Sequence, residues 1–543
     1  MANFSLSPVV SVREFDQSTI IQATSTSIGA IVLNATWGSV ETVETVITED
    51  QLVSEFGKPN STNFRDIMTA ANFLAYSNNL KVVRVLGTGA LNSCSTATTA
   101  GSGVLIKNRD IYDATDFSAS TNLWIGRFAG ALGNAVGVAW CDTTGFNAQS
   151  GGNYTWPYRA SFTDAPATNE YHIVVYDATG LITGAAGTIL ETYPFASTVS
   201  NAIYYDGSSA YFRDRINTMS SWIYVGKASL FTGTSSGVTL GGGVDGSAPT
   251  DANRITGYSL FLDPESIDVN LVMAGNSGAT ASQWIIQSLA EVRRDCMAFV
   301  SPMAADVVGI TDVDVAVTNI LATRTTYGSS TYAVMDSVYK YQYDKYNNVY
   351  RWVPLNGDVA GLCARVDDQY DPWFSPGGYN RGLIKNVMKF SQVLKKAHRD
   401  SLYSKGVNPC IIDKADGAVL YGDKTLISRG SVFGVIGIRR MFITIEKAIA
   451  TASKYFLFEQ NDDYTRARFV NMVTPFLRDV QGRRGLQKFN VQCDRNNNPD
   501  DIVAEQILVA DIVVLPTFSI NYIRLNFTGV SGSATFDEIV MAQ

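Results

Sequence analysis

The order strand, helix, strand occurs twice in this chain of 543 residues, and it constrains the fold more than any other feature. Residues 27–48 alternate Gly, Val, Ile and Thr around a turn at Trp37-Gly38, which predicts two strands. A helix and a strand at residues 81–86 follow. Residues 270–302 repeat the order. Parallel strands need crossover connections, so we expect one largely parallel sheet built from both stretches. The predicted helix of the first stretch has one apolar stripe, formed by Phe64, Ile67, Met68, Ala71 and Leu74.

A stretch of different composition, residues 91–244, separates these two patterns. It is rich in Ser, Thr, Gly, Asn and Tyr, and its turn signals are dense. Short β-like runs occur at residues 171–176 and 222–225. We therefore expect a β-rich domain inserted into a loop of the first domain, with residues 240–246 as the return hinge.

The final third of the chain, from about residue 339, carries the longest predicted helices. Apolar stripes predict helices at residues 383–397 and 441–452. A third predicted helix, residues 465–481, contains Pro475, which must start or kink a helical segment. The fold class is therefore α+β and multidomain, with mixed α/β inner and middle domains and a β-rich inserted outer domain. The expected domains are residues 1–25 with 350–543, residues 26–90 with 245–349, and residues 91–244.

Cysteine and histidine usage argues against redox and metal chemistry. The six cysteines are far apart in the sequence and form no CxxC pair, which is typical of reduced thiols in a protein made in the cytoplasm. With only His172 and His398 available, a His-based metal site is not expected. We also see no signal peptide and no apolar run of about 18 residues that could cross a bilayer. The sequence predicts no cofactor and no membrane insertion.

Charge is distributed unevenly along the chain. Residues 375–490 contain 20 Lys and Arg against 9 Asp and Glu, a net charge of +11. The remaining residues contain 22 basic and 41 acidic side chains, a net charge of −19. This polarity predicts an oriented molecule whose basic part contacts either nucleic acid or an acidic protein surface. Clear stacking aromatics are absent from the basic part, so we expect no direct nucleic-acid binding.

Three motifs that could carry chemistry fail on their context. Residues 233–237 match the nucleophile elbow, but the Gly-rich residues that follow cannot form the helix it needs, so we expect a loop. Residues 494–505 resemble a calcium loop, but Pro499 replaces the required glycine, and a hairpin turn is expected instead. The glycines at 241–246 lack the Gly-Lys-Ser/Thr of a phosphate loop. These failures predict a protein that is not an enzyme.

Both ends of the chain have the pattern of an extended strand. Near the N-terminus this strand contains Val9, Val10 and Val12. Near the C-terminus, at residues 519–528, apolar and polar side chains alternate as in a half-buried strand. Such strands can lie on their own sheet or add to the sheet edge of a neighbouring copy. The C-terminal strand residues of interest are Ile520, Tyr522, Ile523, Leu525 and Phe527.

Several stretches have a specific sequence pattern. They are residues 6–8, 56–59, 82–85, 339–354, 358–367, 375–382, 419–425 and 519–527. These stretches resemble the tail sheath protein of contractile-tailed bacteriophages. The resemblance covers residues 1–90 and 245–530, and residues 91–244 cannot be matched one by one. One departure is Gly377-Gly378, where family members more often have Ala-Gly.

The resemblance implies a structural subunit of a helical sheath, built from stacked rings of this chain around a tail tube. It implies that both terminal strands join neighbouring subunits and that the domain of residues 1–25 with 350–543 faces the tube. The implied partners are other copies of the chain, the tube protein, and baseplate and tail terminator proteins. The implied location is the virion tail. The resemblance implies that the sheath is assembled in the host cytoplasm and that its contraction drives the tube through the host envelope. The basic residues expected to face the tube are Arg466, Arg468, Arg478, Arg483, Arg484 and Lys488.

Three alternatives stay open at this point. One is the sheath of a bacteriocin or of a secretion-type contractile injection machine, which shares the structural role. Another, from a different class, is a glycan-binding or hydrolytic protein that acts through residues 91–244. The third is a nucleic-acid-binding protein that uses the basic final third of the chain.

Overall fold

The computed structural model describes residues 25–97, 99 and 101–525. The chain divides into two compact units, which we describe separately. The described residues of the large unit lie between 25 and 455, and those of the small unit are 456–525. Helices and sheets are both abundant in this multidomain chain, which confirms the predicted α+β class.

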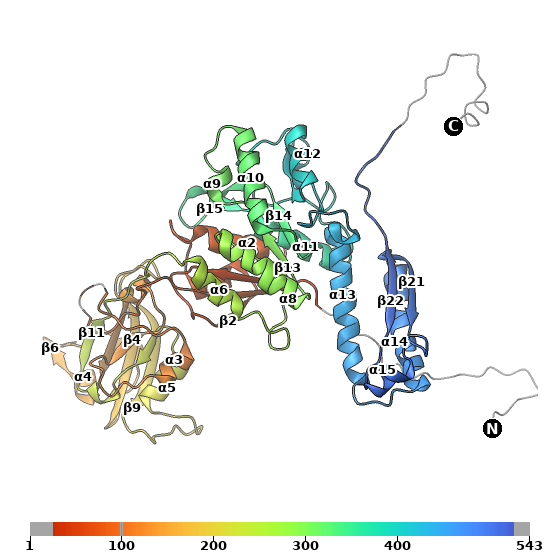
Figure 1. The fold of residues 1–543 in the computed structure, drawn as a ribbon. Coiled ribbons are helices and arrows are strands. Elements are labelled where there is room, and N and C mark those ends of the chain that lie inside the picture. The colour runs from red at the N-terminus through yellow and green to blue at the C-terminus, as the bar shows by residue number, and fades with distance from the viewer. Residues whose placement is uncertain (1–24, 98, 100, 526–543) are drawn as a thin grey trace, which may run out of the picture. The chain divides into compact units, whose positions relative to one another are not determined.

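A seven-stranded sheet forms the centre of the large unit (Figure 1). Its strands pair in parallel except β2 with β3, which are antiparallel. Ala30 pairs with Val272 on one side and with Lys81 on the other, so the two predicted strand–helix–strand stretches do build one sheet. The strand order is β18 (Val407–Asn408), β14 (Ala333–Asp336), β13 (Met297–Val300), β12 (Leu271–Met273), β1 (Gly29–Leu33), β3 (Leu80–Arg84) and β2 (Val43–Val46).

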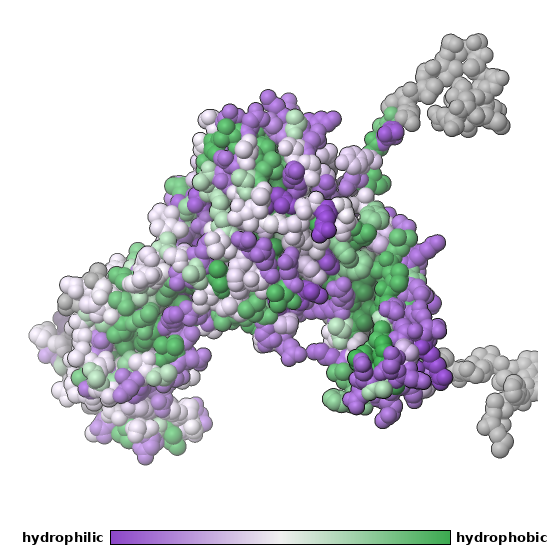
Figure 2. Space-filling view, viewed as in Figure 1, coloured by the Kyte–Doolittle hydropathy of each residue, from purple (hydrophilic) through white to green (hydrophobic). Residues whose placement is uncertain are grey.

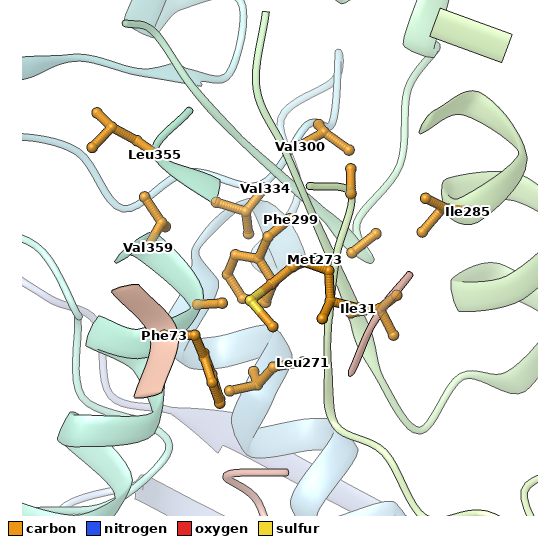
Figure 3. Close-up of a cluster of buried hydrophobic side chains, with 14 of the residues drawn as sticks. Ile31, Phe73, Leu271, Met273, Ile285, Phe299, Val300, Val334, Leu355 and Val359 are labelled. Atoms are coloured by element: carbon orange, nitrogen blue, oxygen red, sulfur yellow. The ribbon is translucent and has the colours of Figure 1, made fainter. Parts of the chain in front are cut away.

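Helices cover this sheet and bury it completely at its centre, where every residue of β1 is buried. Figure 3 shows Met273 and Phe299, which are paired residues of β12 and β13, among the apolar side chains of this core. A π-helix at Ile285–Ala290 lies between α7 and α8. The helices of the large unit around the sheet are α1 (Glu49–Phe56), α2 (Phe64–Leu74), α6 (Asp251–Ser259), α7 (Ala279–Trp284), α8 (Glu291–Arg293), α9 (Ala304–Val307), α10 (Val313–Tyr327), α11 (Asn356–Gln369), α12 (Lys396–Ser404) and α13 (Ile436–Ser453).

Residues 91–244 have sheets and apolar clusters of their own. The outgoing and returning chains are bridged, since the backbone N–H of Cys94 donates to Gly241 O at 2.8 Å and that of Leu91 to Val244 O at 3.0 Å. The expected return hinge, residues 240–246, therefore lies beside residues 91–94, and we call these two hydrogen-bonded segments the stem of the insertion. The strands here are β4 (Trp124–Gly126) with β10 (Ile223–Val225), β6 (Gln149–Ser150) with β7 (Asn153–Tyr154), and the sheet β11 (Ser235–Thr239), β5 (Val136–Cys141), β8 (Glu170–Asp177) and β9 (Thr188–Ser197). The helices are α3 (Arg109–Ala114), α4 (Thr143–Asn147) and α5 (Phe212–Met219).

Two expectations about the final third are wrong. The first is the domain boundary at residue 350. β18 joins the central sheet and α11 packs on that sheet, so this boundary would cut through one core. The compact units separate near residue 455 instead. The helix expected at residues 383–397 is absent, and short strand β17 (Lys389–Phe390) stands there instead. Phe390 and Leu394 are buried but Leu383 is 37% exposed, and Gln392 is buried between Phe390 and Leu394, so burial here alternates as in an extended segment. The strands of this region are β15 (Tyr339–Asp344), β16 (Val349–Pro354), β19 (Cys410–Asp413) and β20 (Gly417–Leu420).

The small unit combines one long helix with a β-hairpin. The helix α14 (Asp463–Gly482) confirms the prediction at residues 465–481 and runs through Pro475. The strands β21 (Leu486–Gln492) and β22 (Asp511–Pro516) pair antiparallel. Between them lies the short helix α15 (Asp500–Ala504), where a plain hairpin turn was expected.

Candidate assembly interface

The small unit places one face of its hairpin against α14. The helix begins where the Asp462 carboxylate accepts the Thr465 N–H at 2.8 Å, a typical N-cap. Its buried stripe packs on β21, whose half-buried residues Phe489 and Val491 pair with Val514 and Ile512 of β22. The buried apolar residues of α14 are Phe469, Met472, Val473, Leu477 and Val480.

The other face of the hairpin is exposed and partly apolar. Val513 and Leu515 are 65% and 46% exposed, and they are paired with Asn490 and Lys488. Figure 2 shows hydrophobic residues over β21 and β22. In the described part of the chain these strands pair only with each other, so the hairpin keeps an edge on each side. An exposed apolar face with open edges is suited to accept further strands.

The residues after β22 extend the exposed apolar character. Ile520, Tyr522, Ile523 and Leu525 are 81%, 86%, 78% and 71% exposed. Residues 517–525 are assigned neither helix nor strand in this chain, and the expected strand between neighbouring copies stays a prediction. A strand requires a paired ladder, and among the described residues no ladder includes residues 517–525. Val9, Val10, Val12 and Phe527 lie outside the described residues.

Five of the six predicted basic residues are exposed, and Arg466 is not. The Arg466 side chain is 7% exposed and its guanidinium donates to Asn461 Oδ1 at 3.0 Å and to Asp463 at 3.1 Å. It therefore holds the start of α14 and offers no surface to a partner, which corrects the prediction. The exposed residues are Arg468, which lies 3.8 Å from Glu459, Arg483, which pairs with Asp479 at 2.7 Å, and Arg478, Arg484 and Lys488.

Buried charged groups in the large unit pair with one another. Lys340 on β15 and Asp358 on α11 are both fully buried, with Nζ and Oδ1 2.9 Å apart. The Tyr76 hydroxyl donates to the same oxygen at 3.2 Å. Burial lowers the pKa of Lys340 and raises the pKa of Asp358, while their mutual attraction opposes both shifts. A second buried pair joins Arg254 to Asp66 through two contacts of 3.1 and 2.7 Å. The Arg254–Asp66 pair and the Tyr76–Asp358 hydrogen bond connect elements of the core that are far apart in sequence.

Arg84 connects the sheet to the stem of the insertion. It is fully buried, and its guanidinium donates to three backbone carbonyls, those of Ala35, Gly38 and Ala129, at 2.9, 2.7 and 2.6 Å. Burial lowers its pKa to about 9. The apolar pattern of residues 82–85 predicted only a strand. It could not predict the contact with Ala129, because that residue lies 45 positions away and approaches Arg84 only when the chain folds.

Two of the three motifs considered for chemistry form a strand and a local turn. Ser235 opens β11, a strand where a loop was expected, and no helix follows it. The Asp494 carboxylate accepts the Asn496 N–H at 2.8 Å and thereby closes a local turn. Across residues 25–97, 99 and 101–525, no group of three or more His, Cys, Asp or Glu side chains could hold a metal ion. No helix in the same ranges is long and apolar enough to cross a membrane. The surfaces described above are those of a structural subunit that binds other chains.

Comparisons with known proteins identify the family to which this structural subunit belongs. Residues 265–426 match the phage tail sheath protein central domain, and residues 428–528 match the phage tail sheath C-terminal domain. The tail sheath protein of Vibrio phage KVP40 is 30% identical over 677 aligned positions, which cover 98% of this chain and 99% of that protein. The chain belongs to the phage tail sheath protein family.

Solved sheath structures share the fold at low sequence identity. A crystal structure of a sheath tail protein from Listeria innocua has a TM-score of 0.55 at 13% identity, covering 88% of this chain and 90% of that chain. The helical sheath of the anti-feeding prophage in its contracted state has a TM-score of 0.52 at 10% identity, covering 97% and 99% of the two chains.

Proposed function

We propose that this chain is the repeating subunit of a contractile sheath that surrounds a phage tail tube. In this role it assembles with copies of itself, in the host cytoplasm, into an extended and metastable tube. Contraction then drives the tail tube through the host envelope and delivers the genome. The family membership over nearly the whole chain supports this proposal. The tail tube, the baseplate and a tail terminator protein are its proposed partners.

The observation that carries the assembly mechanism is the exposed apolar segment after β22. Ile520, Tyr522, Ile523 and Leu525 would be costly to leave in water, and the described part of the chain assigns no strand to the segment that carries them. Every copy also has the β21–β22 hairpin, whose outer edges pair with no other described strand. The segment would add to the hairpin of a neighbour as an extra strand, and the N-terminal residues 9–12 would act in the same way.

Such strand exchange would keep subunits connected while their domains move. Contraction needs two arrangements of the same subunits, with the contracted one lower in free energy. The additional contacts between subunits would supply that free energy without a nucleotide. A few kcal/mol per subunit would be enough, because many copies switch together.

Proline substitution tests the added strand directly. Proline at Ile523 or Leu525 removes a backbone donor from the ladder, and neither residue belongs to a strand of the described chain, so folding should be unaffected. Ile523→Pro and Leu525→Pro should give soluble, folded protein that forms no tubes in electron micrographs. Ile523→Val and Leu525→Val are the matched controls and should form tubes. Deletions of residues 1–14 or 519–543 should act like the prolines. Normal tubes from the proline variants and from either deletion would contradict strand exchange.

The sheath of an injection machine remains the second candidate. The contracted anti-feeding prophage sheath has the same fold, but its sequence identity of 10% is below the 30% identity to the phage protein. The genes beside this one would separate the two, since a phage encodes head and DNA-packaging proteins and an injection machine does not.

A further inference from the structure

The small unit carries separated charges of opposite sign. Residues 459–468 and 493–511 contain eight Asp and Glu against three Arg, a net charge of −5. Residues 476–490 contain four Lys and Arg against one Asp, a net charge of +3. The basic excess over residues 375–490 is therefore not a property of this unit as a whole. We call the first set the acidic end and the second the basic end.

The structure places these sets at opposite ends of α14. At the start of the helix, Arg495 pairs with Asp463 at 2.8 Å, and the Asn461 amide donates to Ile507 O at 2.8 Å. At its other end, the Gln481 amide donates to Gln487 O at 2.8 Å, which holds the start of β21 there. A helix of 20 residues is about 30 Å long, so the two ends are about that far apart. In Figure 1, α15 lies at one end of α14 and the hairpin extends to the other.

The main charges of each end are exposed and available. Asp500, Asp501 and Glu505 at the acidic end form no ion pair with another described residue. Arg478, Arg484 and Lys488 at the basic end likewise form none within the described chain. Two complementary, unused surfaces on one unit are suited to contact each other between copies.

Stabilisation of α14 itself does not explain this arrangement. Acidic residues near a helix start and basic residues near its end do interact favourably with the helix dipole, but only within the first and last turns. Asp500, Asp501 and Glu505 lie in and just after α15, and Lys488 lies on β21. These charges are outside α14, so another cause is needed for their separation.

We propose that small units of successive copies bind head to tail, with the basic end of one copy against the acidic end of the next. This inference rests on the proposed sheath function, which supplies the second copy. Contacts between two different surfaces of identical subunits generate open helical polymers. Reversed addition would bring like charges together, so the contact also fixes the polarity of the polymer. The acidic partner of the basic end is then this chain itself, and not the tail tube.

Charge reversal at each end, alone and combined, tests the contact. One variant carries Arg478→Glu, Arg484→Glu and Lys488→Glu, and a second carries Asp500→Lys, Asp501→Lys and Glu505→Lys. Each should raise the critical concentration for tube formation about tenfold at low salt, because each surface ion pair changes an equilibrium by roughly two- to threefold. An equimolar mixture of the two variants should form tubes near the wild-type concentration. A chain with all six reversals should do so too.

Matched controls separate this contact from a general effect of net charge and from unfolding. Lys396→Glu, Lys405→Glu and Lys414→Glu make the same charge change on exposed lysines of the large unit and should leave the critical concentration within about twofold of the wild type. Circular dichroism melts should show that all variants are folded. The proposal is overturned if single reversals polymerise normally, or if the mixture and the six-reversal chain stay defective while folded. A basic-end variant that polymerises alone but fails to assemble on tail tubes would overturn it too, and would assign that end to the tube. Failure of the wild type to form tubes would instead contradict the proposed function.

Discussion

Removal of the Asp358 carboxylate should destabilise the large unit strongly. Lys340 and Asp358 are both fully buried, and the substitution Asp358→Ala leaves the ammonium without its partner 2.9 Å away. Breaking a buried pair in this way costs about 3–5 kcal/mol. At roughly 2 °C for each kcal/mol in a unit of this size, the melting temperature should fall by about 6–10 °C.

A double replacement distinguishes the pair from simple loss of packing. Lys340→Met combined with Asp358→Leu removes both charges and keeps apolar volume, so its stability should lie within about 1–2 kcal/mol of the wild type. The surface pair Lys345–Glu49 is the matched control, and Glu49→Ala should shift the melting temperature by less than about 2 °C. Differential scanning calorimetry measures all of these variants. An Asp358→Ala protein that melts within about 2 °C of the wild type, or a double variant less stable than both single ones, would show that the buried pair does not have this role.

Three further predictions concern the insertion and its stem. Arg84→Leu leaves three buried carbonyls without donors and should cost about 3 kcal/mol or more, seen as faster proteolysis in the stem. Asp177→Ala removes the acceptor of the Gly180, Ile182 and Thr183 N–H groups and should raise hydrogen exchange in the loop after β8. Burial lowers the pKa of His172, so its contribution to stability is complete above the unfolded-state pKa of about 6.5 and is lost as pH falls through the lower folded pKa. His172→Gln should flatten the pH dependence of the melting temperature. A pH dependence equal to that of the wild type would contradict this role of His172.

Local patterns identified the elements correctly where the apolar spacing and the burial agree. The stripe from Phe64 to Leu74 is α2, the stripe at residues 441–452 lies in α13, and the runs near residues 30, 82 and 272 are adjacent strands of one sheet. The same periodicity failed at residues 383–397. Apolar residues at helical spacing there do not share one buried face, since Phe390 and Leu394 are buried while Leu383 is 37% exposed.

The fold class, the strand–helix–strand sheet, the inserted β-rich region and the family resemblance could all be read from the amino-acid sequence, because they depend on composition and on short-range spacing. Three other features became visible only in the folded chain: residues 350–455 share the core of the central sheet, Arg466 is buried, and the charges of the small unit are separated along α14. The shared core and the charge separation depend on contacts between residues distant in sequence, and the burial of Arg466 depends on how the residues around the start of α14 fold against it. A run of letters gives the sign of every charge, but the neighbours and the exposed face of each charge are set only when the chain is packed.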